Sequence, residues 1–452
     1  MKKKIALLFL VTFLCVTSLC LFSCGDASDN NGGGNVPSGE IVSDPSLFYY
    51  SYREDGTYAV SPKQKNSLPS AFVIPDEYNG IQVTAIKDYA FANCAIERVY
   101  MGKNIVSIGQ RAFQNCESLT LVEITGGVIE HQAFAGCMKL STVTLKEGVV
   151  EIGNGAFMGC ETLSALVLPN SMTMIGTSAF ENCKALTSLE IPVNVSHIGY
   201  SAIAGCENLT SLSVAQGNNY YSSQNNCVVE LNTKTLVLGL SSSIFPEDIE
   251  KIGDNAFKGC LGLVDLVLPD SVVEISTSAF EGCANLRSIT FGNNLEVLGD
   301  SAFAGCVSLR AIAIPDDVTY IGARCFASCS TLSVVDFPDA LTSIGPRAFL
   351  DCVYLTAVVL PNSVEHIGYG SFYGCSGLIS IDLGNGIKSI GGASFWGCSN
   401  LASVHIPLSV AAIGSKAFHG CTSLTITTDF TAENPGWSDG WNDSRCPVIW
   451  KE

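Results

Sequence analysis

A cysteine recurs along most of this chain at an almost fixed interval, and the residues around it recur with it. The first two steps are 22 and 21 residues, and almost every later step is 23. The repeat cysteines are Cys94, Cys116, Cys137, Cys160, Cys183, Cys206, Cys260, Cys283, Cys306, Cys329, Cys352, Cys375, Cys398 and Cys421. A fixed period of this length is typical of stacked supersecondary units. The sequence therefore predicts one elongated array rather than several separate globular domains.

Each unit combines two short alternating runs with a compact segment between them. In the unit SAFAGCVSLRAIAIP, apolar and small residues alternate over 309–314, as in a strand with one buried face. Pro315 then ends the ladder because it has no N–H to donate. Residues 318–322 predict a second short strand, and residues 302–306 predict one tight helical turn that points Phe303 inward. A single unit cannot bury its apolar side chains alone, so the units must stack.

The phrase I-G-x-x-A-F-x-G-C, within each unit, resembles the BspA-type leucine-rich repeat family, the bacterial class with a 23-residue unit. The resemblance extends from about residue 47 to the C-terminus. It implies a solenoid with a parallel sheet along one face. We therefore expect an α/β solenoid, a right-handed leucine-rich repeat superhelix of mainly short parallel strands with single helical turns, in about 15 coils.

The repeat cysteines should form a buried file along the array, because each occupies the same place in its coil. A disulfide needs Cβ atoms that face each other, whereas neighbours in a parallel ladder point the same way. We therefore predict reduced thiols that act as small apolar fillers, with a disulfide framework as the alternative. No pair of C-x-x-C motifs converges, so no metal site is expected.

Two places depart from the repeat. The step from Cys206 to Cys260 is 54 residues, and two alternating runs over 227–238 predict a β-hairpin within an irregular coil near 215–247. Just before this coil, Ile203 stands where other units have Phe. The smaller side chain either lets the array bend, or the change is neutral sequence drift for which neighbouring residues compensate.

The two ends of the array should differ from its middle, because an end unit exposes an open edge. Residues 47–80 hold aromatic strands and predict an N-terminal β cap, followed by the repeat array at 81–425. Residues 426–452 predict a C-terminal cap that contains Trp437, Trp441 and Trp450. The alternative for these tryptophans is a site on which sugars stack.

The N-terminus reads as an export signal. Three lysines at 2–4 precede an almost wholly apolar run at 5–22. The segment Leu21-Phe22-Ser23-Cys24 resembles the bacterial lipoprotein box, which implies a signal peptide at 1–23, an acylated Cys24 and a flexible polar tether at 24–46. The alternative is an ordinary secretory signal. The lipoprotein interpretation predicts a location in the bacterial cell envelope, anchored by lipid in the outer membrane and facing the exterior.

Charge and motif content exclude several functions. The net charge is −18 and the pI about 4.6, so the surface repels phosphate backbones, and we expect no nucleic-acid partner. The five histidines are dispersed, and no nucleophile motif, zinc motif or phosphate-binding loop is present. We therefore expect no enzymatic activity, no catalytic residue and no cofactor.

The alternation also predicts which side chains face outward from the strand that precedes the proline. This face is small, smooth and faintly acidic. Its candidate binding residues are Arg98, Tyr100, Glu123, Glu190, Asp265, Asp336, Asp382 and His405. The resemblance implies adhesion and protein binding.

The leading hypothesis is therefore a lipid-anchored monomer on the cell surface that binds an extracellular protein or glycoprotein, such as a host or matrix protein. It touches a membrane only through its lipid. One alternative is glycan binding or processing at the envelope, with Tyr49, Tyr50, Tyr220, Tyr221 and the terminal tryptophans as stacking groups. Another is a structural spacer.

Overall fold

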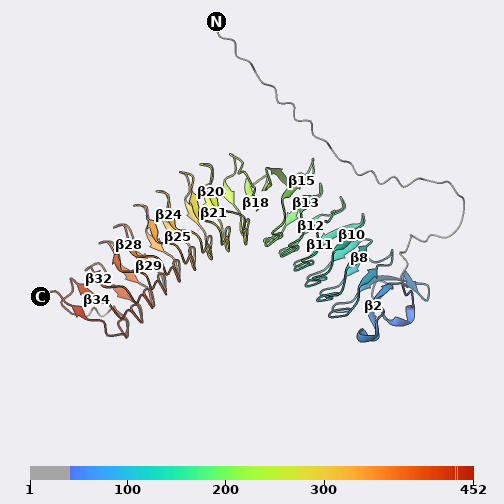
Figure 1. The fold of residues 1–452 in the computed structure, drawn as a ribbon, viewed down its shortest axis with the longest axis horizontal. Coiled ribbons are helices and arrows are strands. Elements are labelled where there is room, and N and C mark those ends of the chain that lie inside the picture. Colours follow the sequence, from blue (N-terminus) through green and yellow to red (C-terminus); the bar gives the residue numbers. More distant parts are fainter. Residues whose placement is uncertain (1–40, 433, 435) are drawn as a thin grey trace, which may run out of the picture. The chain divides into compact units, whose positions relative to one another are not determined.

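The protein is a β-solenoid of about 17 turns with parallel strands, and its coils lie side by side in chain order (Figure 1). The computed structural model describes residues 41–432, 434 and 436–452. The predicted signal peptide, Cys24 and the tether as far as residue 40 lie outside the described residues. The prediction of about 15 coils is too low, because strands at both ends pair with the sheets and complete turns without the cysteine motif. The right-handed sense of the superhelix stays a prediction.

One series of strands, here called the glycine-side strands, mostly precedes the Gly of the I-G phrase. It forms two long sheets. The first contains β1 (Phe48–Tyr52), β2 (Tyr58–Pro62), β5 (Ile81–Ile86), β7 (Ser107–Ile108), β9 (Gly127–Ile129), β11 (Val149–Ile152), β12 (Met174–Ile175) and β14 (His197–Ile198), with β4 (Glu77–Tyr78) paired to β5. The second contains β16 (Tyr221–Gln224), β17 (Cys227–Glu230), β18 (Thr235–Gly239), β19 (Lys251–Ile252), β21 (Glu274–Ile275), β23 (Val297–Leu298), β25 (Tyr320–Ile321), β27 (Ser343–Ile344), β29 (His366–Ile367), β31 (Ser389–Ile390) and β33 (Ala412–Ile413).

The other series, here called the proline-side strands, mostly comes just before the proline of each unit. Its sheets are β3 (Ala71–Val73), β6 (Arg98–Tyr100), β8 (Leu121–Ile124) and β10 (Thr142–Leu145); β13 (Ser188–Ile191) and β15 (Ser211–Val214); β20 (Asp265–Val267) and β22 (Ser288–Thr290); β24 (Ala311–Ala313) and β26 (Val334–Asp336); and β28 (Ala357–Val359), β30 (Ser380–Asp382), β32 (Ser403–Ile406), β34 (Thr425–Thr428) and β35 (Val448–Ile449).

The parallel pairing implied by the family resemblance is present, together with the second short strand predicted for each unit. The coils carry two series of parallel strands, and the proline-side series is interrupted four times. Two interruptions follow Phe291 and Phe337, which occupy positions where other coils have Ile or Leu. Each ring packs edge-on against a core phenylalanine with centroids 5.9 Å apart, so a larger group lies under the strand where the pairing is lost.

The single helical turns predicted for the A-F-x-G-C segments are not confirmed. The helices among the described residues are two short 3-10 helices near the N-terminus, η1 (Pro45–Leu47) and η2 (Lys65–Ser67). In the segment at 301–306, Ser301 and Gly305 have left-handed backbones with φ of 56° and 74°, which no α-helix accommodates. The amides of Ala302, Ala304 and Cys306 bond three residues back, so the segment is a series of tight turns.

The other amides of this segment bond to the next coil. The N–H groups of Ser301, Phe303 and Gly305 donate to the carbonyls of Ala323, Cys325 and Ala327, each at 2.8 Å. Along this segment, the N–H groups therefore alternate between hydrogen bonds within the turn and hydrogen bonds to the next coil. In a helical turn these N–H groups would point along the helix axis and not toward the next coil, and successive coils would then lose this contact.

Close approach of the coils also explains the glycine of the I-G phrase. A Cβ atom on Gly322 would lie 2.5 Å from the carbonyl carbon of Gly299 in the preceding coil. Backbone atoms cannot give way at such a distance, so this position needs a residue without a side chain.

The core contains two columns that run along the array. The first consists of phenylalanine rings stacked from Phe91 to Phe180 and again from Phe257 to Phe418, with centroids 5.0–6.0 Å apart and rings within 15° of parallel. Offset stacking at this spacing adds to the free energy gained by burying each ring. The predicted ladder of inward phenylalanines is thus present.

The second column consists of the repeat cysteines. All cysteines of the described chain are unpaired, and most are buried. Each regular thiol also donates to the phenylalanine carbonyl of the preceding coil, with Sγ–O distances of 3.0–3.4 Å. The prediction of apolar fillers was therefore incomplete. A carbonyl has two lone pairs, and that of Phe303 accepts both the Cys306 amide and the Cys329 thiol.

Aromatic side chains cover both ends of this core. At the N-terminal end, Phe48 lies on Phe72 and Phe91. At the other end, Trp441 packs edge-on against Phe418, and the Trp437 indole N–H donates to the carbonyl of Val410 at 3.3 Å. Both of these tryptophans are buried. This packing leaves their faces closed to a sugar, and the C-terminal cap at 426–452 stays a prediction.

Alkaline pH should destabilise the protein through its buried thiols. Burial raises the pKa of Cys160, Cys206 and Cys375 from the ordinary 9.0 to about 12. The unfolded chain therefore releases protons near pH 9 that the folded chain retains. The contribution of these thiols to the free energy of unfolding is fully present below pH 9. It falls as the pH rises towards 12, by up to about 1.4 kcal/mol per thiol and pH unit.

Urea unfolding at pH 8, 9 and 10 measures this loss. The free energy of unfolding should fall steeply above pH 9, and a Cys375→Ala variant should show a shallower fall. A free energy of unfolding that stays constant up to pH 10 would contradict the account.

Candidate functional site

The predicted binding residues all lie on proline-side strands and at positions that point away from the core. They are Arg98 and Tyr100 on β6, Glu123 on β8, Glu190 on β13, Asp265 on β20, Asp336 on β26, Asp382 on β30 and His405 on β32. The first three are half-buried and the other five are exposed. Their strands come from many coils, so these residues form a line along the array and do not converge in one pocket.

The acidic members of this line are largely without cationic partners. Glu123 forms an ion pair with Lys146 at 3.3 Å. Among the described residues, no Lys or Arg pairs with Glu190, Asp265, Asp336 or Asp382. Asp265 accepts from the Ser288 hydroxyl at 2.6 Å. This face therefore carries exposed negative charge that a cationic partner would neutralise.

Apolar side chains lie between these acids. Four valines at outward positions, Val167, Val267, Val334 and Val359, are 57–82% exposed. The outward positions are alanines on β24 and Ala357 and Val359 on β28, so β24, β26 and β28 together present small apolar groups around Asp336. Contiguous exposed apolar surface with a polar rim is typical of a protein contact site.

A shallow groove follows the interruption between β26 and β28. Its walls include Val334, Phe337, Ala357 and Val359, with Asp336 and Asp339 beside them. Sequence reasoning missed this groove. Its signal was the phenylalanine at position 337, where the repeat has Ile or Leu.

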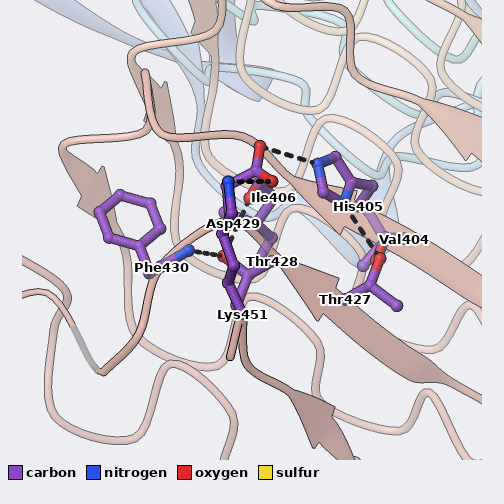
Figure 2. Close-up of polar contacts among 8 residues, drawn as sticks. All are labelled: Val404, His405, Ile406, Thr427, Thr428, Asp429, Phe430 and Lys451. Carbon is purple, nitrogen blue, oxygen red and sulfur yellow. Dashed lines mark hydrogen bonds and ion pairs between the residues drawn. The ribbon is translucent and has the colours of Figure 1, made fainter.

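The line ends in a polar cluster around His405 (Figure 2). The imidazole Nδ1 lies 3.1 Å from Thr427 Oγ1, and Nε2 lies 3.2 Å from Asp429 Oδ2. Lys451 Nζ approaches the other oxygen of Asp429 at 3.9 Å. Of these residues, only His405 was predicted from the sequence. Thr427 follows it by 22 residues, almost one repeat, and that spacing was the available signal.

Hydroxyl, imidazole and carboxylate lie in the order that a nucleophilic triad uses. In such a triad the carboxylate is buried, and preorganised donors in a site closed to water stabilise the oxyanion. Here the His405 and Asp429 side chains are 53% and 39% exposed. The cluster has the properties of a recognition surface, because its donors and acceptors face water.

Other groups with possible chemistry do not form a site. Burial raises the pKa of most repeat cysteines, so these thiols are protonated at neutral pH and are weak nucleophiles. Within the described ranges no group of three or more His, Cys, Asp and Glu side chains is arranged to hold a metal ion.

The aromatic residues proposed for sugar stacking separate into two groups. Tyr221 is buried, as are Trp437 and Trp441, whereas Tyr49 and Tyr220 are exposed. Tyr50 stacks against Tyr78 with centroids 3.9 Å apart, which closes one of its faces. These residues therefore do not form a single platform.

No helix in the part of the chain that the structure describes has the length and apolar character to cross a membrane. No curated protein sequence matches the chain.

Solved structures of bacterial leucine-rich repeat proteins are similar to the chain. One from Eubacterium ventriosum is 24% identical, with a TM-score of 0.60, and the match covers 87% of this chain and 96% of that one. One from Bacteroides ovatus is 25% identical, with a TM-score of 0.51 and coverages of 90% and 98%. A leucine-rich cell surface protein from Faecalibacterium prausnitzii is 25% identical, with a TM-score of 0.49 and coverages of 90% and 97%. The first two share the fold of this chain.

The sequence pattern of the BspA type Leucine rich repeat region matches six copies, over residues 76–129, 127–237, 235–356 and 342–432. These matches span most of the chain and coincide with the stacked coils. The chain therefore belongs to the BspA-type leucine-rich repeat family.

Proposed function

We propose that this protein is a lipid-anchored cell-surface receptor that binds an extracellular protein, such as a host or matrix protein, along its proline-side strands. Proteins with leucine-rich repeats generally act through protein interaction, and this supports a protein partner. The observation that carries the proposal is the row of exposed valines and unpaired acids from β20 to β30.

The chemistry of this face favours an extended partner segment with apolar and basic residues. Val267, Val334 and Val359 offer apolar contact, and Asp265, Asp336 and Asp382 offer negative charge on three coils of this stretch. Along this stretch each coil contributes one or two small groups, so affinity accumulates over many modest contacts. Large aromatic or arginine anchors, which dominate compact hot spots, are missing from the outward positions of β20 to β30.

The His405 cluster extends this surface at its C-terminal end. Its imidazole and carboxylate offer hydrogen bonds at a fixed separation, because Thr427 and Lys451 hold them from both sides. A polar group at the end of an apolar row fixes the position of a bound segment along the array.

The anchor part of the proposal rests on the sequence around Cys24. Acyl chains on that cysteine and the polar segment after it would hold the solenoid outside the outer membrane. A monomer suits this arrangement. Glycan binding or processing remains the second candidate because Tyr49 and Tyr220 are exposed, and a structural spacer is the third.

Binding can be measured against a panel of purified extracellular matrix glycoproteins, each in native and enzymatically deglycosylated form. A double variant, Val334→Asp with Val359→Asp, should weaken binding at least about tenfold, because it places charge in an apolar contact. Its melting temperature should not change, since both side chains are exposed.

The matched control is Val106→Asp with Val297→Asp, two exposed valines on or beside the glycine-side strands. This control should bind normally. Equal losses in both double variants, or no binding to any matrix protein, would contradict the proposal. Loss of binding on deglycosylation would instead favour the glycan alternative.

The anchor is tested separately by replacing its acyl acceptor. A Cys24→Ser variant should move from the membrane fraction to the soluble fraction, and protease treatment of intact cells should degrade the unaltered protein. A variant that stays with the membrane would contradict lipidation, and resistance to protease would contradict exposure to the exterior.

A further inference from the structure

The irregular coil between Cys206 and Cys260 divides the buried core into two separate clusters. One cluster runs from Phe48 to Leu240, and the other from Cys227 to Cys446. The two overlap in sequence only at strands β17 and β18. Every regular coil, by contrast, shares its core with both neighbours.

The hairpin of β17 and β18 acts as a partition between these clusters. The strands pair antiparallel, with a register shift between Val228 and Val229 that leaves Val237 of β18 out of the pairing. Val228 and Leu238 belong to the N-terminal cluster, whereas Cys227 and Leu236 belong to the C-terminal cluster. On β17 the successive residues Cys227 and Val228 face opposite sides. On β18 the register shift lets Leu236 and Leu238, two residues apart, face opposite sides as well, so the hairpin separates the clusters instead of joining them.

The phenylalanine column is broken at the same place. The stacking contacts end with Phe157 on Phe180 and begin again with Phe257 on Phe280. Ile203 occupies the intervening position. No aromatic contact joins Phe180 to Phe257 among the described residues.

The hydrogen-bond ladder of the turns stops there too. The Phe180 amide donates to Ala202 at 2.8 Å, and the ladder resumes with the Phe257 amide, which donates to Ala279 at 2.8 Å. In the part of the chain that is described, the amides of Ser201, Ile203 and Gly205 find no backbone acceptor. These are the positions whose counterparts in regular coils bond to the next coil.

The repeat thiols are least buried at this joint. Cys206 and Cys260 are the only two repeat cysteines that are partly exposed, and both line one cavity between the adjoining turns. Cys260 also lacks the carbonyl acceptor that the regular thiols have, as far as the described residues show.

We propose that this joint divides the solenoid into two blocks that fold and unfold as separate cooperative units. In a stacked array, cooperativity depends on the free energy of each interface between neighbouring coils. A regular interface includes a ring stack, three turn hydrogen bonds and a thiol hydrogen bond. Of these, the joint retains one bond to the next turn, from the Gly239 amide to the Ala256 carbonyl at 3.1 Å. Here the N-terminal block contains the coils of Cys94 to Cys206, and the C-terminal block contains those of Cys260 to Cys446.

Pulsed alkylation of thiols in increasing urea tests this division on the intact protein. Mass spectrometry of peptides then gives an unfolding midpoint for each cysteine. Within a block all buried cysteines should share one midpoint, and the two blocks should differ. Cys206 and Cys260 should be labelled fastest without urea.

Two reciprocal variants sharpen the test. Phe134→Leu should lower the midpoints of the N-terminal thiols, including those of distant coils in that block, and leave the C-terminal midpoints unchanged. Phe349→Leu should do the opposite. Both replaced rings are fully buried in the middle of a regular stack, so the two variants are matched.

A common midpoint for all thiols, shifted together by either variant, would overturn the proposal. A shift confined to the coils next to the replaced ring would also overturn it, because the blocks would then not be cooperative. If a variant fails to fold, the labelling curves of the unaltered protein decide between one transition and two.

Discussion

The hydrogen bonds from alternate turn amides to the next coil are the interaction on which this structure depends. They require left-handed residues at two places in each turn, such as Ser301 and Gly305, and these residues prevent a helix from forming. Because the turn is not helical, the regular coils approach closely enough for the phenylalanine rings to stack at 5.0–6.0 Å and for each of their thiols to reach a carbonyl. The repeated cysteine and phenylalanine therefore follow from one requirement, which is a turn that bonds to its neighbour.

Because the contacts that stabilise the fold lie in the core and the turns, the outward side chains of the proline-side strands are available for recognition. Stability comes from the columns inside the coil, so outward positions such as Val334 and Asp336 are not needed to hold the fold together. Their side chains can vary from coil to coil while the core stays regular. The two phenylalanines at 291 and 337 are an exception, because they lie under the strands and coincide with interruptions in the outward sheet.

Features that recur with the repeat, such as strands and inward side chains, were predictable from the sequence. Features that depend on contacts between coils were not. Alternation at 309–314 identified a strand and its outward side, and the inward position of Phe303 was predicted correctly. The A-F-x-G-C segment was interpreted as a helical turn because its length suits one, and no rule of spacing revealed that its alternate amides leave the coil. Similarly, His405 was visible as an outward residue, but its partner Asp429 and the Lys451 that pairs with Asp429 come from residues 426–452, where the repeat no longer fixes the register. The hairpin at 227–238 was predictable, whereas its action as a partition required the assignment of each side chain to a core cluster.

Hydrogen exchange of individual amides tests the central claim most directly. The amides of Phe303 and its counterparts in the regular coils should exchange as slowly as those of the core strands, because each donates to the next coil at about 2.8 Å. The Ile203 amide, at the joint, should exchange much faster. Rapid exchange at the regular phenylalanine amides, with protection confined to the strands, would contradict the account.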